Sequence, residues 1–115
     1  MEDNRSMTQV FLVITTVPTH DEAIALSRQA IVEGFAVCAQ IQAPCQSVYQ
    51  WQGSIEEAKE YPIHFKTNQL MHQALRDFIA QKHSYDVPEI ISIQVDTVNE
   101  SYAAWLDASL DKQGQ

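Results

Sequence analysis

A strand–helix–strand pattern that occurs twice constrains the fold of this chain more than any other feature of the sequence. The hydrophobic periodicity predicts, in chain order, a strand at 9–17, a helix at 20–33, a strand at 35–43, hairpin arms at 46–51 and 58–67, a helix at 69–82, a strand at 89–98 and a helix at 100–110. Because crossover connections are right-handed, the two units combine into one antiparallel sheet with both longer helices on the same face. The sequence therefore predicts an α+β fold, a ferredoxin-like βαββαβ sandwich with a long hairpin between its second and third strands and a C-terminal helix.

The strands at 9–17 and 89–98 carry apolar side chains on both faces, which is typical of strands that are covered on both sides. Two helices cover one face of the predicted sheet, and the helix at 100–110 is too short to cover the other face alone. An exposed apolar face of this kind marks an interaction surface. We therefore expect a closed homo-oligomer whose sheets pack together around the symmetry axis.

Local signals set the ends of the two longer helices. Thr19 and Glu22 have the spacing of a capping box at the start of the first helix. Gly34 follows that helix as its C-terminal cap. Asn68 is expected to cap the start of the second helix.

The hairpin is predicted from two strand-like arms that turn at Gln52-Gly53. Pro44 interrupts the apolar run before the hairpin, so a bend or bulge is expected there. Pro62 has no amide proton to donate, so its position is expected at a sheet edge or a bulge. Glu56-Glu57 is interpreted as a solvated acidic turn near the hairpin tip.

Length and charge limit the classes of partner. With 115 residues, the chain is expected to form one domain over residues 8–115, after a disordered tail at 1–7. A net charge of −8 disfavours a nucleic-acid partner, because nucleic-acid-binding proteins carry basic surfaces. The chain has no apolar run of about 18 residues, so no membrane span is predicted. An N-terminus without a signal-peptide pattern indicates a cytoplasmic protein.

Catalytic chemistry has little support in the sequence. No nucleophile–base pair or H-E-x-x-H pattern is present, and 3 glycines are too few for a phosphate-binding loop. Cys38 and Cys45 do not have the spacing of zinc ligands and are interpreted as reduced, buried or half-buried thiols. We therefore predict a protein that is not an enzyme.

Several motifs along the chain resemble the CutA family of divalent-ion tolerance proteins. They are AVCAQI at 36–41, SVYQWQGSIEE at 47–57, Lys66-Thr67, HSYDVPEI at 83–90 and SYAAWLDASL at 101–110. Their order and spacing match over residues 9–110, so the resemblance is specific. It implies a ferredoxin-like homotrimer, similar in shape to the PII-type signalling trimers, with a role in binding or tolerating divalent metals such as copper.

The resemblance places the family's proposed metal ligands at His83 and Glu89. An imidazole and a carboxylate suit Cu(II) or Zn(II) as a nitrogen–oxygen pair. Two ligands make a weak site that water or a neighbouring subunit must complete, and no metal is required for folding. Copper-linked members of the family have a cysteine where this chain has Thr15, and a hydroxyl is a poorer ligand for a soft metal than a thiolate.

An alternative interpretation of residues 82–89 is a structural turn between a helix and a strand. In that case His83 interacts with the C-terminus of the helix, Tyr85 fills the core, and Pro88 sets the entry into the strand. The remaining histidines are interpreted as surface residues: His20, His64 and His72.

Tyr49, Trp51, Glu60 and Lys66 lie on the two arms of the hairpin and are candidates for a cleft between subunits. Such a cleft would take a small ligand or an anion, and the alternative is interface packing, in which aromatic residues are enriched. Two functional hypotheses follow. One is a metal-binding or metal-tolerance trimer, and the other is a PII-like structural or signalling trimer that presents its clefts to a protein partner or a small ligand.

Overall fold

The computed structural model describes residues 8–113, so the tail predicted at residues 1–7 lies outside the described part of the chain. The elements are β1 (Val10–Val17), α1 (His20–Val32), β2 (Cys38–Ile41), β3 (Cys45–Trp51), β4 (Ser54–Asn68), α2 (His72–Lys82), β5 (Ile90–Gln94) and α3 (Glu100–Gln113). The strands form an antiparallel sheet in the order β2-β4-β1-β5, and β3 pairs with the first half of β4. The predicted α+β, ferredoxin-like architecture is confirmed.

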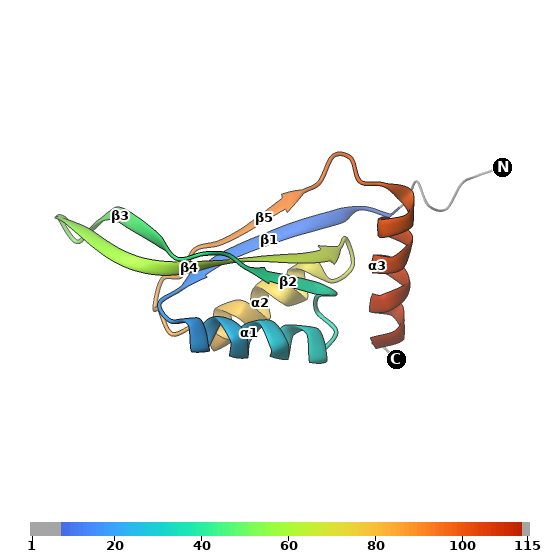
Figure 1. Ribbon diagram of the computed structural model, residues 1–115, viewed down its shortest axis with the longest axis horizontal. Helices are drawn as coiled ribbons and strands as arrows, with labels where there is room; N and C mark the ends of the chain where they lie inside the picture. Colours follow the sequence, from blue (N-terminus) through green and yellow to red (C-terminus); the bar gives the residue numbers. More distant parts are fainter. Residues whose placement is uncertain (1–7, 114–115) are drawn as a thin grey trace.

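One face of the sheet packs on α1 and α2, which lie side by side beneath it (Figure 1). β1 contributes Val13 and Val17 to this core, and β4 contributes Ile63 and Phe65, all fully buried. The helices add Ala23, Leu26, Ala30, Leu75, Phe78 and Ile79. Because side chains alternate along a strand, a slip of one residue would turn this apolar set toward solvent, so the core fixes the register of the sheet.

α3 crosses the end of the sandwich where β1 begins and β5 ends (Figure 1). Leu106 and Leu110 on α3 bury against Val10 in a second, smaller apolar cluster. Asn68 Nδ2 donates a hydrogen bond to Asp107 Oδ1 at 2.8 Å, which ties the end of β4 to this helix. α3 therefore closes one end of the molecule and leaves most of the second sheet face open. None of the helices described within residues 8–113 has the length and apolar character of a membrane span.

The open sheet face carries an apolar patch that we call the open-face patch, made of Leu12, Ile14, Ile91 and Ile93. Leu12 and Ile14 are half-buried, whereas Ile91 and Ile93 are each 45% exposed. The register of β1 with β5 pairs Ile14 with Ile91 and Leu12 with Ile93, so the four side chains are contiguous across two strands. Apolar side chains on both faces of these strands were predicted, and the patch is the part that no helix covers.

The predicted ends of α1 are confirmed. Thr19 Oγ1 accepts a hydrogen bond from the amide of Glu22 at 3.1 Å. Gly34 has a φ of 80°, and the amide of Phe35 donates to the carbonyl of Ala30 at 3.0 Å. This is the bonding of a helix that ends on a left-handed residue, which glycine adopts without steric cost.

The predicted start of α2 is wrong by one turn. Asn68 is the last residue of β4, and α2 begins at His72. Asn68 Oδ1 accepts hydrogen bonds from the amides of Leu70 and Met71, both at 3.1 Å, so it caps the turn that precedes the helix. The side chain of Asn68 has the capping chemistry that the sequence indicated, but it acts on an intervening turn.

The hairpin turns at Gln52-Gly53 as predicted, with φ values of 51° and 83°. Two successive residues with positive φ are required by a type I′ turn, whose twist matches that of paired strands. Because only these two residues form the loop, β4 begins at Ser54 rather than at residue 58. Glu56-Glu57 consequently lies in a paired strand, and its interpretation as a turn is wrong.

Pro62 lies inside β4 but faces a gap in the neighbouring strands. The amide of Gln42 donates to the carbonyl of Pro62 at 2.8 Å, and the N and O atoms of one strand residue point to the same side. On that side β2 ends at Ile41 and β3 begins at Cys45, with Pro44 in the interruption between them. The break expected at Pro44 thus accommodates the missing donor of Pro62.

Candidate functional site

The segment 83–89 leaves α2 through a histidine that uses both ring nitrogens. His83 Nε2 lies 2.8 Å from the carbonyl oxygen of Thr16, and Nδ1 accepts the amide proton of Tyr85 at 3.0 Å. A carbonyl can only accept, so Nε2 carries the proton and the imidazole is neutral in this arrangement. His83 therefore connects the segment 83–89 to the end of β1 through Thr16, and it stabilises the turn that follows through Tyr85.

Tyr85 joins this segment to β4. Its hydroxyl donates to Glu60 Oε2 at 3.0 Å, and its ring lies 5.0 Å from that of His83. Burial, and then the hydrogen bond and charge of Glu60, raise the pKa of Tyr85 to about 12. Glu60 is buried, so this hydroxyl satisfies one oxygen of a carboxylate that would otherwise be poorly solvated.

Thr15 holds the start of β5 from the other side of the sheet. Its side chain is fully buried, and its hydroxyl donates to the backbone carbonyl of Glu89 at 2.7 Å. The odd-numbered residues of β1 face the helices, and the even-numbered residues face the open side of the sheet. The side chain of Thr15 therefore lies on the helix side, and that of Thr16 lies on the open side. The structural role of Thr15 has no counterpart in the sequence analysis.

Glu89 and Glu60 line one groove of about 360 Å³, which we call the acidic groove. The groove lies between β3 and the segment 83–89, and Thr16 and Tyr85 contribute to its wall. His83 is not among its lining residues. Glu89 and Glu60 thus line the same groove. His83 lies outside the groove and is linked to it by accepting the amide proton of Tyr85.

A second groove of about 320 Å³ adjoins the first, and we call it the aromatic groove. Its lining residues are Tyr49, Trp51, Ser84, Tyr85, Asp86 and Val87. The acidic and aromatic grooves share most of this wall, so together they form one cleft beside the hairpin.

The hairpin contributes three of the four cleft residues that the sequence indicated. Tyr49, Trp51 and Glu60 line the cleft. Lys66 does not, because its Nζ donates to the side-chain oxygen of Gln40 on β2. Without Lys66, the only charged residues in the lining are acidic, which favours a cation over the anion first considered.

Comparison with known proteins identifies the family of this chain. The family model described as CutA1 divalent ion tolerance protein matches residues 11–109. The chain belongs to the CutA1 divalent ion tolerance protein family. A divalent-cation tolerance protein CutA from Yersinia pestis (strain Pestoides F) is 33% identical over 105 residues, which is 91% of this chain and 88% of the relative.

Solved CutA1-family structures share the fold over almost the whole chain. The CutA1 protein of Ehrlichia chaffeensis is 30% identical with a TM-score of 0.86, covering 90% of this chain and 97% of that one. CutA from Synechococcus elongatus PCC7942 is 35% identical with a TM-score of 0.85, covering 89% and 90% respectively. The resemblance drawn from the sequence motifs is therefore confirmed at the level of family and fold.

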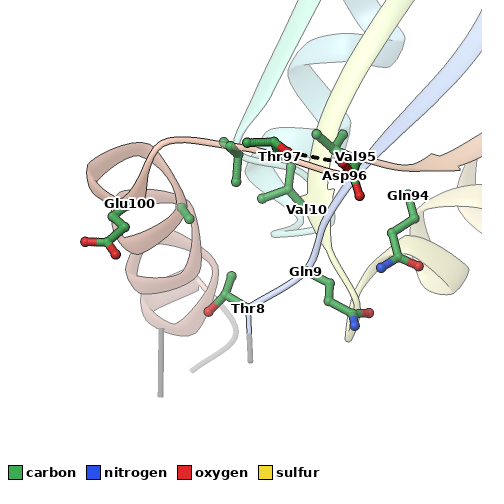
Figure 2. Close-up of a pocket in the computed structure, with 10 residues that line it drawn as sticks. Thr8, Gln9, Val10, Gln94, Val95, Asp96, Thr97 and Glu100 are labelled. Atoms are coloured by element: carbon green, nitrogen blue, oxygen red, sulfur yellow. Dashed lines mark hydrogen bonds between the residues drawn. The ribbon is translucent and has the colours of Figure 1, made fainter. Parts of the chain in front are cut away.

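This CutA1-family chain has a third groove, of about 380 Å³, at the opposite end of the sheet. Figure 2 shows it between the start of β1, the residues after β5 and the first turn of α3. Thr97 Oγ1 donates to Asp96 Oδ2 at 3.2 Å, and Glu100 lies in the first turn of α3, where the helix dipole favours negative charge. Local structure accounts for both carboxylates, so we assign no function to this groove.

The environments of His72 and Cys45 differ from those predicted from the sequence, which placed His72 at the surface and Cys45 in a buried or half-buried position. His72 is not a solvent-facing residue, because its ring stacks on Phe11 at 3.9 Å and Nδ1 lies 3.3 Å from Ser92 Oγ. Burial, with a smaller contribution from the charge of Arg76, lowers the pKa of His72. Cys38 and Cys45 are unpaired as predicted, but Cys45 is exposed.

Proposed function

We propose that this protein acts as a homotrimer that binds divalent cations at the acidic groove. The observation that carries the proposal is that Glu60 and Glu89 both line one groove, in a chain of a divalent ion tolerance family. Neither lysine nor arginine contributes to the lining, so the only charged side chains that a cation meets in the groove are carboxylates.

The donor set fits an oxygen-coordinated cation. Carboxylates and hydroxyls suit Mn(II), Mg(II) or Ca(II), whereas imidazole and thiolate suit copper and zinc. Within residues 8–113, no group of three or more His, Cys, Asp or Glu side chains is placed to hold a metal ion. A cation between Glu60 and Glu89 therefore needs water, or groups from a neighbouring subunit, to complete its coordination.

The His83–Glu89 pair suits Cu(II) or Zn(II), and binding of either ion by this pair requires a nitrogen of His83 as a ligand. His83 Nε2 carries a proton for Thr16, and Nδ1 already accepts the amide of Tyr85. Coordination through either nitrogen requires one of these bonds to be given up. The geometry thus favours carboxylate coordination first, with His83 joining only after the segment rearranges.

The trimer is supported by two surfaces that the single chain leaves exposed. The open-face patch presents contiguous isoleucines, and a second copy of this chain offers the same apolar chemistry. The hairpin extends well beyond the sandwich (Figure 1), in a chain whose extents are 57 × 26 × 22 Å. Its side chains Val48 and Ile55 are 64% and 78% exposed, as expected of an arm that packs on a neighbour.

Isothermal titration of Mn(II) and Cu(II) into the wild type and into Glu89→Gln tests cation binding at the acidic groove. The amide keeps the shape of the side chain and removes its charge, so the Mn(II) affinity should fall roughly tenfold or more. Glu100→Gln is the matched control, because it makes the same change in the third groove. Equal losses in the two variants, or no heat with either ion, would contradict the proposal.

A further inference from the structure

The aromatic groove is lined by three aromatic rings, which are not ligands for a divalent metal ion. Tyr49 and Trp51 are two residues apart on β3, so their side chains project to the same face of the hairpin. They are 45% and 44% exposed, although both are large aromatic residues. Tyr85 supplies a third ring from the opposite wall.

The third ring is held in position before any ligand enters. The Tyr85 hydroxyl donates to Glu60, and its amide donates to His83. Bonds at both ends of the residue leave the ring little freedom to turn away. A ligand that packs on Tyr85 therefore does not have to order it, and preorganisation of this kind favours binding.

The charge of the aromatic groove is negative. Asp86 is the only charged residue in its lining, and the carboxylates of Glu60 and Glu89 lie in the adjoining groove. An anion would be repelled by these groups, and a neutral apolar ligand would make no use of them. Aromatic faces beside a carboxylate attract a cation that has an apolar body, because the ring faces are the negative part of the quadrupole.

From this combination we propose that the aromatic groove binds a small organic ammonium cation. Its charged head lies against the ring faces of Tyr49 and Trp51 and near the carboxylate of Asp86, and its apolar part contacts Val87. The volume of about 320 Å³ is suited to a small molecule rather than to a polymer. A bare divalent metal ion is disfavoured here, since ring faces supply no ligand atoms to such an ion. The inference does not depend on metal binding at the acidic groove.

A tryptophan-fluorescence titration with choline tests the proposal. The chain has 2 tryptophans, so Trp105→Phe leaves Trp51 as the only reporter. The titration is made with EDTA present, which removes metal binding from the result. Choline is expected to change the Trp51 emission in a saturable way, and its neutral isostere 3,3-dimethylbutan-1-ol is expected to bind roughly tenfold more weakly.

Two variants in the Trp105→Phe background locate the effect. Tyr49→Leu removes a ring and keeps apolar volume, and Asp86→Asn removes the charge and keeps shape. Each should weaken choline binding several-fold, while Val32→Ala, at an exposed position on α1, should leave it unchanged. Equal binding of choline and its isostere would overturn the proposal. So would the absence of any choline response, which is the result expected if a neighbouring subunit's side chain fills the groove.

Discussion

At the residue scale, His83 is the side chain on which the candidate site depends most. Its ring bonds to Thr16 of β1 and to the amide of Tyr85, which in turn reaches Glu60. His83→Ala is expected to lower the free energy of unfolding by about 2 kcal/mol, because it leaves a part-buried carbonyl and an amide without partners. It should also lower the Cu(II) affinity.

Urea denaturation and Cu(II) calorimetry measure these two effects of His83→Ala. His20→Ala is the control, since it removes an exposed imidazole that makes only an edge contact with Tyr61. Unchanged Cu(II) binding would exclude His83 as a ligand. A loss of stability no greater than in the control would contradict its role in holding the segment.

Tyr85 gives the site a dependence on alkaline pH. Its pKa is raised from 10.0 to about 12 by burial and by Glu60, so the folded state favours the neutral phenol. This contribution is fully present below pH 10 and is lost as the pH rises toward 12, because the unfolded chain ionises first. The urea midpoint should fall over that window in the wild type, and the fall should be smaller in Tyr85→Phe. An identical pH dependence in the two proteins would contradict this assignment.

Local patterns along the chain indicated candidates for part of this site. Tyr49 and Trp51 were candidates for a cleft between subunits because they lie on the hairpin, and in the single chain both line one cleft. The bond from Thr15 to the carbonyl of Glu89 spans 74 residues and depends on how β1 pairs with β5. A contact of that range is a consequence of the sheet register, and no local pattern carries it.

At the scale of elements, the hairpin turn is the most demanding piece of backbone. Gly53 has a φ of 83°, and an added Cβ would meet no atom within 4 Å. Gly53→Ala should therefore destabilise the protein through backbone strain alone, by about 1 kcal/mol. Gly53→Asn should cost less, because asparagine tolerates this region. Thermal melting of the two variants gives the comparison, and a melting temperature for Gly53→Ala equal to that of the wild type would contradict it.

Element identity was predictable from the sequence, whereas element length was not. The order of helices and strands was predicted correctly, because apolar periodicity and turn residues are local signals. The predicted βαββαβ pattern counted one interrupted strand where the structure has β2 and β3. The strands predicted at 35–43 and 89–98 are shorter in the structure, where β2 and β5 have 4 and 5 residues. Apolar residues just outside these two strands, such as Ala36 and Val98, are buried in or packed against the two apolar clusters. Burial beyond the ends of a strand therefore extends the same apolar pattern.

At the scale of the whole molecule, the open-face patch is expected to join copies of the chain. Ile93→Glu places a charge at this patch and should convert a trimer into a species with the mass of one chain. Val32→Glu is the control, because Val32 is 79% exposed on the helix side. Sedimentation velocity distinguishes the species. A wild type that sediments as a monomer at micromolar concentration would contradict the proposed assembly.

The most direct test of the central claim is to locate the bound ion. Paramagnetic broadening of amide NMR signals by substoichiometric Mn(II) falls steeply with distance from the ion, so it maps the site on the folded protein. Binding at the acidic groove predicts broadening centred on the amides of Thr16, Glu60, Tyr85 and Glu89, and its loss in Glu89→Gln. Broadening centred on Asp96 and Glu100, or spread evenly over the acidic surface, would contradict it.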